Sequence, residues 1–287
     1  MNEDPYKILA EAEKAHSYKG WFGQNKLDEA AELYTKAANQ FKLQKKLKEA
    51  GDCFLKQADC CLKAGEKDEA SSSYINASKA FKKGYPQESV DALSLAVGIL
   101  SERGRFQAAA TNQKQIAEIY EVDLENFEKS LNAYELAAEW FSGEDSNAQA
   151  SACQLKAANL AAHLEQYQKA IEKFEQVAKQ SMENNLTKWS VRDYLLKAGI
   201  CILCTQDYIN ARQALDRYRA MDMTFEGTRE FKLLNDLLDA LENQDVEQFT
   251  NVVFDFDKMT KLDNWKTTLL LRVKKSISDP SSLEDFT

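Results

Sequence analysis

The chain has 287 residues and a formal net charge of −9, with 37 Lys and Arg against 46 Asp and Glu. It exceeds the usual size of one compact core, about 50–200 residues, but a repeat protein grows by stacking and escapes that limit. No stretch approaches the roughly 18 apolar residues of a membrane-spanning helix, and the first residues lack the basic and apolar regions of a signal peptide. We therefore expect a cytosolic protein, and its acidic balance argues against nucleic acid as the main ligand.

Residues 5–17 predict a short amphipathic helix, and residues 18–26 predict a loop that carries two adjacent aromatic residues, Trp21 and Phe22, between glycines and near lysines. Such a pair suits a membrane interface, where aromatic rings lie at headgroup depth and lysine meets anionic lipid. It equally suits a loop that packs on the first helical hairpin. The residues alone leave both interpretations open.

Through most of the chain a pattern returns about every twenty residues: a small residue, a large apolar one three or four positions later, then alanine. Tyr34 and Tyr74 are forty residues apart, as are Tyr134 and Phe174. The spacing places these side chains on one helical stripe, and alanine lets a neighbouring helix approach closely. The sequence therefore predicts an all-α fold, a tetratricopeptide-like solenoid of antiparallel helical hairpins over residues 1–220.

Most of the expected turns carry glycine, which readily adopts the left-handed conformation that ends many helices. The turns are expected at Gly65, Gly84, Gly104, Gly143 and Thr205–Gln206. Only three prolines occur, so little else interrupts helix between these turns.

The repeat pattern stops at residues 221–228, and three later helices lack the alanine signature. They are expected at 229–242, 246–257 and 262–278. We expect them to form a C-terminal helical bundle over 221–287, followed by a polar, flexible acidic segment that contains Leu283 and Phe286. Residues 221–287 hold 8 Lys and Arg against 14 Asp and Glu, a net charge of −6, which suits either a basic protein partner or a solubilising acidic face.

Nothing in the sequence predicts catalysis, a cofactor or a metal. The two histidines, His16 and His163, lie far apart, and no phosphate-binding loop, dinucleotide motif or zinc-protease motif occurs. The six cysteines lie in amphipathic stretches, as buried thiols do in a reducing compartment. Cys201 and Cys204 have the spacing of a metal or redox pair, but no second pair or nearby histidine accompanies them, so we expect them in the core.

Several basic residues of the repeats form a candidate binding surface. A charge on an exposed helix is often simply solvated, but several on one concave face of a solenoid would bind an elongated acidic partner. The candidates are Lys42, Lys45, Lys46, Lys48, Lys82, Lys83, Arg105 and Lys156.

Several segments, in their order along the chain, resemble the soluble NSF attachment proteins (SNAPs), most closely the alpha type and its fungal relatives. They are Ala80–Lys83 with Pro86-Gln-Glu, Gly104-Arg-Phe106, Ile116–Tyr120, Leu164–Ile171, Arg192-Asp-Tyr194 and Leu262–Lys275. The resemblance runs almost end to end and implies an adaptor that lies along the four-helix bundle of an assembled SNARE complex, built from syntaxin-type and synaptobrevin-type SNAREs and their partners. It also implies recruitment of the hexameric ATPase NSF, stimulation of its ATPase, and SNARE disassembly after membrane fusion in vesicle-mediated transport, such as ER–Golgi transport.

The resemblance implies roles for individual residues as well. The SNARE-binding set is Lys82, Lys83, Arg105, Lys114, Lys156, Arg192 and Arg229. At Thr111 and Ala152 the alpha type carries lysine, a departure that either weakens SNARE binding or is offset by Lys114. Trp21 and Phe22 match the apolar loop that contacts membrane. The NSF-facing set is Asp207, Asp239, Glu242, Leu283, Glu284, Asp285 and Phe286, with Phe286 in place of the family's leucine. The implied location is the cytoplasm, peripherally on the cytosolic face of vesicle, Golgi, ER or plasma membranes.

Two other functions suit a helical solenoid. A tetratricopeptide-type co-chaperone would capture a peptide end with convergent lysine and asparagine side chains, a pattern that is not evident in this sequence. A vesicle-coat or scaffold component would leave every ATPase unaffected. The shape of the ligand distinguishes the first from the SNARE adaptor, because a co-chaperone would bind a short peptide and the adaptor only a folded bundle.

Overall fold

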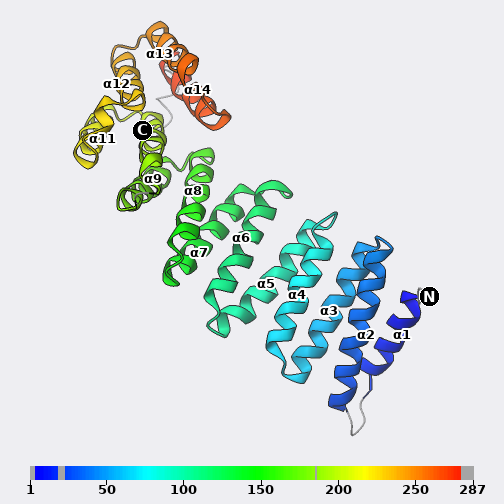
Figure 1. The fold of residues 1–287 in the computed structure, drawn as a ribbon. Helices are drawn as coiled ribbons and strands as arrows, with labels where there is room; N and C mark the ends of the chain where they lie inside the picture. The colour runs from blue at the N-terminus through cyan, green and yellow to red at the C-terminus, as the bar shows by residue number, and fades with distance from the viewer. Residues whose placement is uncertain (1–3, 19–22, 185, 279–287) are drawn as a thin grey trace, which may run out of the picture. The chain divides into compact units, whose positions relative to one another are not determined.

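The structure is a computed structural model that describes residues 4–18, 23–184 and 186–278. Fourteen α-helices and two short 3₁₀ helices make up this part of the chain (Figure 1). The chain divides into two compact units, unit 1 over Met1–Cys153 and unit 2 over Gln154–Thr287. The all-α helical-hairpin fold expected from the repeat pattern is confirmed, and the boundary expected near residue 220 stays a prediction.

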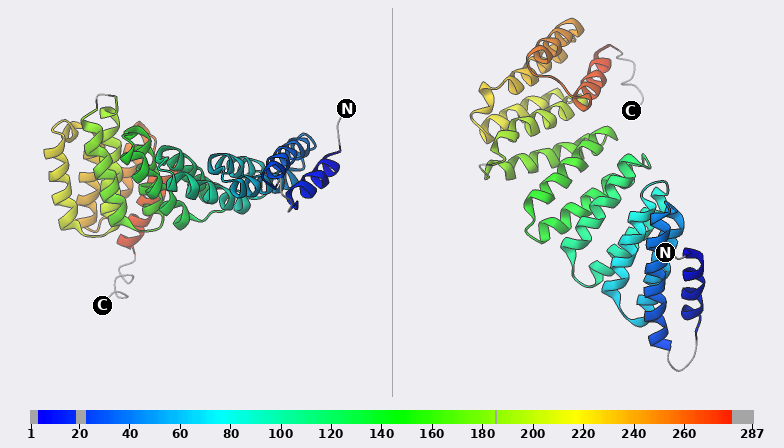
Figure 2. Two further views of the ribbon diagram at one scale, coloured as in Figure 1. Left: turned by 90° about the horizontal axis from the view of Figure 1, so that it is seen from below. Right: turned by 45° about the vertical axis from the view of Figure 1, so that its right-hand side comes forward.

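Unit 1 is a row of antiparallel helices in which each helix packs on the one before it (Figure 2). The helices are α1 (Pro5–His16), α2 (Gly23–Leu43), α3 (Leu47–Ala64), α4 (Lys67–Phe81), α5 (Pro86–Glu102), α6 (Phe106–Val122) and α7 (Phe127–Gly143), followed by the first turns of α8 (Asn147–His163). Asp4 caps α1 by accepting a hydrogen bond from the backbone N–H of Tyr6 at 3.1 Å. The loop expected over 18–26 is too long, because α2 already begins at Gly23.

A residue in the left-handed conformation recurs about every twenty residues, at the turns between helices. The turns expected at Gly65, Gly84 and Gly104 are confirmed, with φ of 85°, 109° and 70°. The turn expected at Gly143 lies slightly later, because α7 includes Gly143 and the left-handed residue is Asp145. The turn expected at Thr205–Gln206 is also confirmed, with Gln206 at φ 61°. Other turns use residues that carry side chains, which is why glycine did not mark them in the sequence. These residues are Lys45, Glu125, Glu165 and Gln244.

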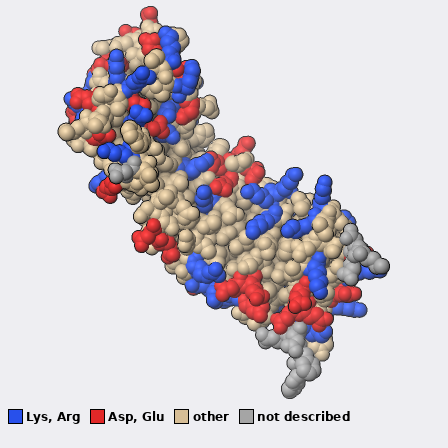
Figure 3. Space-filling model, in the orientation of Figure 1, with Lys and Arg blue, Asp and Glu red and all other residues tan. Residues whose placement is uncertain are grey.

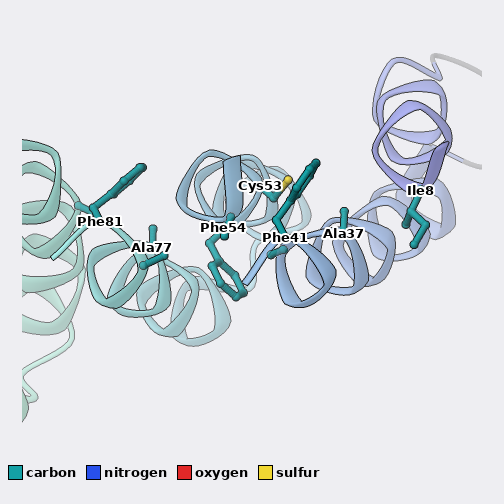
Figure 4. Close-up of a cluster of buried hydrophobic side chains, with 11 residues drawn as sticks. Ile8, Ala37, Phe41, Cys53, Phe54, Ala77 and Phe81 are labelled. Atoms are coloured by element: carbon teal, nitrogen blue, oxygen red, sulfur yellow. The ribbon is translucent and has the colours of Figure 1, made fainter. Parts of the chain in front are cut away.

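Small residues allow the helices of unit 1 to approach closely. Gly51 of α3 lies against the ring of Phe81, so that a Cβ added at Gly51 would lie 2.6 Å from Cδ1 of that ring. Ala37 and Ala77 are fully buried in the same cluster, and the rings of Phe41 and Phe81 fill the remaining space (Figure 4). Each buried Phe contributes roughly 1.5–3 kcal/mol relative to an exposed one. The repeat of small and large residues therefore sets how closely the helices of unit 1 approach, and we call this pattern the packing code of the unit.

Unit 2 contains the rest of α8 and the remaining helices. They are α9 (Tyr167–Met182), the 3₁₀ helix η1 (Lys188–Ser190), α10 (Val191–Cys204), α11 (Tyr208–Met221), η2 (Phe225–Gly227), α12 (Arg229–Glu242), α13 (Val246–Met259) and α14 (Asn264–Ser278). The three helices expected after the repeats are confirmed, with α13 ending at Met259 and α14 beginning at Asn264. Gly199 gives Leu234 of α12 room to pack on α10, because an added Cβ would lie 2.7 Å from Cδ2 of that leucine.

The cysteines lie in the core, as expected from their amphipathic surroundings. All six are free thiols, and five of them are buried, the exception being the half-buried Cys204. Burial raises the pKa of Cys201 well above its ordinary value and that of Cys204 to about 12, so both thiols stay protonated at neutral pH. Among the described residues, no helix is both long enough and apolar enough to cross a bilayer.

Candidate functional site

Lys82 and Lys83 lie in the turn between α4 and α5, and both side chains are exposed. Neither has an ion-pair or hydrogen-bond partner within the described ranges. Lys48, at the same end of the hairpins, instead contacts Glu88 at 3.2 Å and lies over the Phe81 ring. Figure 3 shows Lys and Arg gathered along the upper edge of unit 1, over the α2–α3 and α4–α5 turns. The two adjacent ammonium groups are therefore available to an acidic partner.

Arg105 lies at the other end of α5, in the α5–α6 turn. Its Nη1 is 3.2 Å from Oδ1 of Asp68, and Nη2 of Arg103 is 2.9 Å from Oδ2 of the same carboxylate. The 17 residues of α5 separate Arg105 from Lys82 and Lys83 by about 25 Å at the rise of a helix. The structure therefore does not bring these predicted contacts into one cluster, and a single partner that meets both ends must be elongated.

Lys114 lies in the middle of α6, with Nζ 3.8 Å from a carboxylate oxygen of Glu118. Thr111 is exposed one turn earlier, and its hydroxyl donates to the carbonyl oxygen of Gln107 at 2.9 Å. Residues three apart share a face of a helix, so Lys114 places a positive charge beside Thr111. At that position this chain lacks the lysine that the family resemblance implies. Lys156 is exposed on the part of α8 that belongs to unit 2.

Arg192 lies in the first turn of α10 and Arg229 begins α12, at one end of unit 2. Arg192 lines a groove of about 470 Å³ together with Trp189 and Thr228, and Thr228 is also the residue that caps α12 immediately before Arg229. The side chain of Trp189 is 80% exposed beside these cations. Sequence reasoning missed Trp189, although a tryptophan in a polar stretch outside the alanine pattern was an available signal.

The acidic residues expected to face the ATPase lie together at the opposite end of unit 2. Asp207 caps α11 and accepts a hydrogen bond from the backbone N–H of Asn210 at 2.9 Å. Asp239 and Glu242, in the last turns of α12, both pair with Arg212 of α11, whose Nη2 is 2.7 Å from Oε2 of Glu242. This hydrogen bond lowers the pKa of Glu242.

Arg212 therefore neutralises part of the acidic set and fixes the position of its two carboxylates. No sequence pattern indicates this arginine, because it lies 27 and 30 residues from its two acidic partners. Only the packing of α11 on α12 brings the three side chains together.

A charge cluster around one buried lysine holds α14 on α10. Lys266 is 9% exposed, and its Nζ is 2.7 Å from Oδ1 of Asp193 and 3.2 Å from Oδ2 of Asp263. Burial acts to raise the pKa of Asp263, but the backbone N–H and the ammonium of Lys266 outweigh it and lower that pKa. Trp265 adds a hydrogen bond from Nε1 to the carbonyl oxygen of Asn159 at 3.1 Å. These contacts attach the first turn of α14 to α10 and α8.

One group of side chains in the described residues has the proximity of metal ligands. Cys61, Glu66 and Glu69 place their ligand atoms within 4.8 Å of one another at the α3–α4 turn. Burial raises the pKa of Cys61, and repulsion from Glu69 raises that of Glu66. Because metals bind the thiolate and not the thiol, this is a weak set of donors.

Two predicted contacts lie outside the described residues: the aromatic pair Trp21 and Phe22, and the segment 279–287, which follows α14. The segment includes Leu283, Glu284, Asp285 and Phe286. Their roles remain expectations from the sequence.

Unit 1 consists of antiparallel helical hairpins with exposed cations at their turns, and unit 2 carries an acidic edge. These features define a helical-repeat binding protein. The sequence matches the family described as "Soluble NSF attachment protein, SNAP" over residues 3–278, and the chain belongs to this family.

Relatives match nearly the full length of the chain. A "Probable vesicular-fusion protein sec17 homolog" of Schizosaccharomyces pombe is 43% identical over 97% of this chain and 98% of the relative. The "Beta-soluble NSF attachment protein" of Bos taurus is 44% identical over 94% and 93%, and the "Alpha-soluble NSF attachment protein" of Homo sapiens is 42% identical over the same shares. Among solved structures, a signal-transduction ATPase with a tetratricopeptide repeat sensor from Pyrococcus horikoshii has a TM-score of 0.50 at 16% identity, covering 95% of this chain and 44% of its own, which supports the fold alone.

Proposed function

We propose that this protein is an adaptor that binds assembled SNARE complexes and recruits the ATPase NSF, which then disassembles the SNAREs after membrane fusion in vesicular transport. Membership of the soluble NSF attachment protein family is the observation that carries the proposal. The names of its relatives, which refer to NSF attachment and vesicular fusion, support it. In this proposal the chain supplies binding surfaces, and ATP hydrolysis takes place on the partner.

The SNARE contact uses exposed cations on the helical hairpins. Lys82 and Lys83 lack ion-pair partners in the described part of the chain, and their separation from Arg105 along α5 matches a rod-shaped partner better than a compact one. An assembled four-helix bundle is such a rod. The remaining contacts of the set are Lys114, Lys156, Arg192 and Arg229. Each depends on complementary charge, so binding weakens as salt rises.

The NSF contact uses the acidic end of unit 2. Asp207, Asp239 and Glu242 converge there, and Arg212 holds two of these carboxylates in place. The segment 279–287, with Leu283, Glu284, Asp285 and Phe286, adds three negative charges and two large apolar side chains. An acidic surface of this kind suits a basic partner domain.

Trp21 and Phe22 provide a third contact, with the membrane. Aromatic rings flanked by lysine lie favourably at headgroup depth, and this contact would hold the adaptor on the cytosolic face of the vesicle, Golgi, ER or plasma membrane that carries the SNAREs.

The test measures the ATPase rate of NSF with this protein, with and without an assembled SNARE complex, while loss of fluorescence transfer reports disassembly of the bundle. We expect both stimulation and disassembly. Binding to SNAREs without either would refute the adaptor function, and the absence of SNARE binding would leave only a generic helical-repeat protein.

The double variant Lys82→Glu with Lys83→Glu tests the SNARE contact. Two charge reversals at exposed positions should leave the helical content unchanged and weaken SNARE binding about tenfold or more at physiological salt, as lost charge pairs of about 1 kcal/mol each imply. The matched control is Lys7→Glu with Lys14→Glu, two exposed lysines of α1 outside the predicted contact. Unchanged binding by the first variant, or an equal loss in the control, would contradict the assignment.

A further inference from the structure

A groove of about 530 Å³ lies between α13 and α14. Its floor is formed by Phe249 and Leu270, which are almost fully buried, and its walls carry Phe254 and Leu271, which are 58% and 53% exposed. Large apolar side chains that are half exposed and share one groove are typical of a surface that another segment covers.

The groove follows helical stripes on both of its walls. On α14 it uses Thr267, Leu270, Leu271 and Lys274, the spacing of one face of a helix. On α13 it uses Phe249, Thr250, Val253, Phe254 and Asp257, again one face. Stripes of this kind are normally buried by a third element, and no described helix of unit 2 closes over this one.

The segment 279–287 has the composition that suits the groove. It carries Leu283 and Phe286 with spacing i, i+3, three acidic residues and no Lys or Arg. The groove has an apolar centre, and its charged residues are Lys274 near the end of α14 and Lys261, which pairs with Asp257 at 2.7 Å. The segment therefore complements the apolar centre, and its carboxylates suit the net positive charge that Lys274 leaves in the groove.

The length of the segment also fits. Leu283 is five residues beyond Ser278, a reach of about 17 Å for extended chain, whereas Leu271 lies seven residues back along α14, or about 10 Å. Asp279 and Pro280 stand directly after the helix, where such a pair favours a turn. A chain that reverses there would return along the groove toward Leu271.

We propose that the α13–α14 groove binds the segment 279–287 of the same chain, with Leu283 and Phe286 packed on Phe254 and Leu271. This inference rests on the proposed function, in which the same segment contacts NSF. Docking in the groove would withhold the segment until NSF displaces it. The free adaptor would then bind NSF less tightly than a variant whose groove cannot hold the segment.

Amide hydrogen exchange of residues 281–287 in the full-length protein tests the docking. Compared with the unfolded-chain rate, we expect exchange about fivefold slower in the wild type, the protection given by a segment docked four-fifths of the time. Phe254→Asp and Leu271→Asp should each abolish the protection. Met223→Asp, at an 86% exposed position in the α11–α12 connection, is the matched control and should leave it unchanged.

A second measurement avoids substitutions in the helices. The variant Leu283→Ser with Phe286→Ser removes the two side chains that cover Phe254 and Leu271. Hydroxyl-radical oxidation of Phe254 and Leu271 should therefore be higher in this variant than in the wild type. Unprotected amides in the wild type, or protection that survives Phe254→Asp, would overturn the proposal. Protection that grows with protein concentration would also overturn it, because the occupant would then be a second copy.

These outcomes are distinguishable from failure of the proposed function. Removal of residues 279–287 abolishes the docking and, under the proposed function, also reduces stimulation of NSF while SNARE binding persists. If stimulation stays normal after removal, the NSF role of the segment is wrong whatever the exchange shows. If stimulation falls but the wild-type amides are unprotected, only the docking is wrong.

Discussion

Substitution of Gly51 by alanine tests the packing code of unit 1. An alanine Cβ at this position would overlap the ring of Phe81, which is fully buried and has no solvent to move into. Helix propensity alone predicts the opposite result, since alanine is favoured over glycine inside a helix by about 1 kcal/mol. The sign of the change in unfolding free energy therefore shows whether side-chain packing or helix propensity dominates at Gly51.

The expected change in unfolding free energy is the difference between the cost of overpacking and the gain in helix propensity. Overpacking a well-filled core costs about 1–3 kcal/mol, and a ring that cannot leave the core places this site in the upper part of that range, about 2–3 kcal/mol. Subtracting the propensity gain leaves a net loss of about 1–2 kcal/mol for Gly51→Ala. Gly98→Ala is the matched control, because Gly98 is exposed within α5 and an added Cβ would meet no atom within 4 Å. That variant should gain about 1 kcal/mol.

The assay is urea unfolding followed by circular dichroism, with amide exchange in α3 and α4 as a local measure. A loss of about 1.5 kcal/mol lowers the midpoint by about 0.6 M for a slope of about 2.5 kcal/mol/M. The difference between the two variants cancels helix propensity and measures the steric cost directly. If Gly51→Ala were as stable as Gly98→Ala, the close approach of α3 and α4 would not depend on the small residue.

Two further predictions concern the membrane contact and the attachment of α14. Trp21→Ser with Phe22→Ser should slow disassembly of membrane-anchored SNAREs much more than of soluble ones, and an equal loss on both would show that the loop is structural. Lys266→Met should cost about 1–2 kcal/mol and speed amide exchange in α14, because the removed ammonium is buried while its acidic partners are half exposed. Lys258→Met, at an exposed ion pair, should cost less than about 0.5 kcal/mol in the same unfolding assay. In the wild type, the depressed pKa of Asp263 stabilises the fold above its ordinary value of 3.8, and a pH titration of stability should show this contribution lost as pH falls below it.

Much of the fold could be predicted because its information is local. Periodic small and large residues predict helices and hairpins, and glycine predicts turns at Gly65, Gly84 and Gly104, because only the conformation of a few adjacent residues is involved. The turns at Lys45 and Glu125 were not predicted. There a residue with a side chain takes the left-handed conformation, which costs free energy that a glycine would not cost. The packing of the flanking helices offsets that cost.

The binding surfaces were predicted less completely. The sequence identified Lys82 and Lys83 as candidates and, through family resemblance, Asp239 and Glu242. It could not show that Arg212 pairs with both acidic residues, since that contact depends on how α11 packs on α12.

The sequence by itself determined the class of fold, the family and the chemical character of each surface, because periodicity, composition and motif order are properties of the chain. Only the tertiary structure decided which charges stay unpaired, that Arg105 lies a full helix length from Lys82, and that Phe254 and Leu271 share one groove. The physical reason is that exposure and pairing depend on distances between helices. Those distances are set by side-chain packing across residues that the sequence separates by tens of positions.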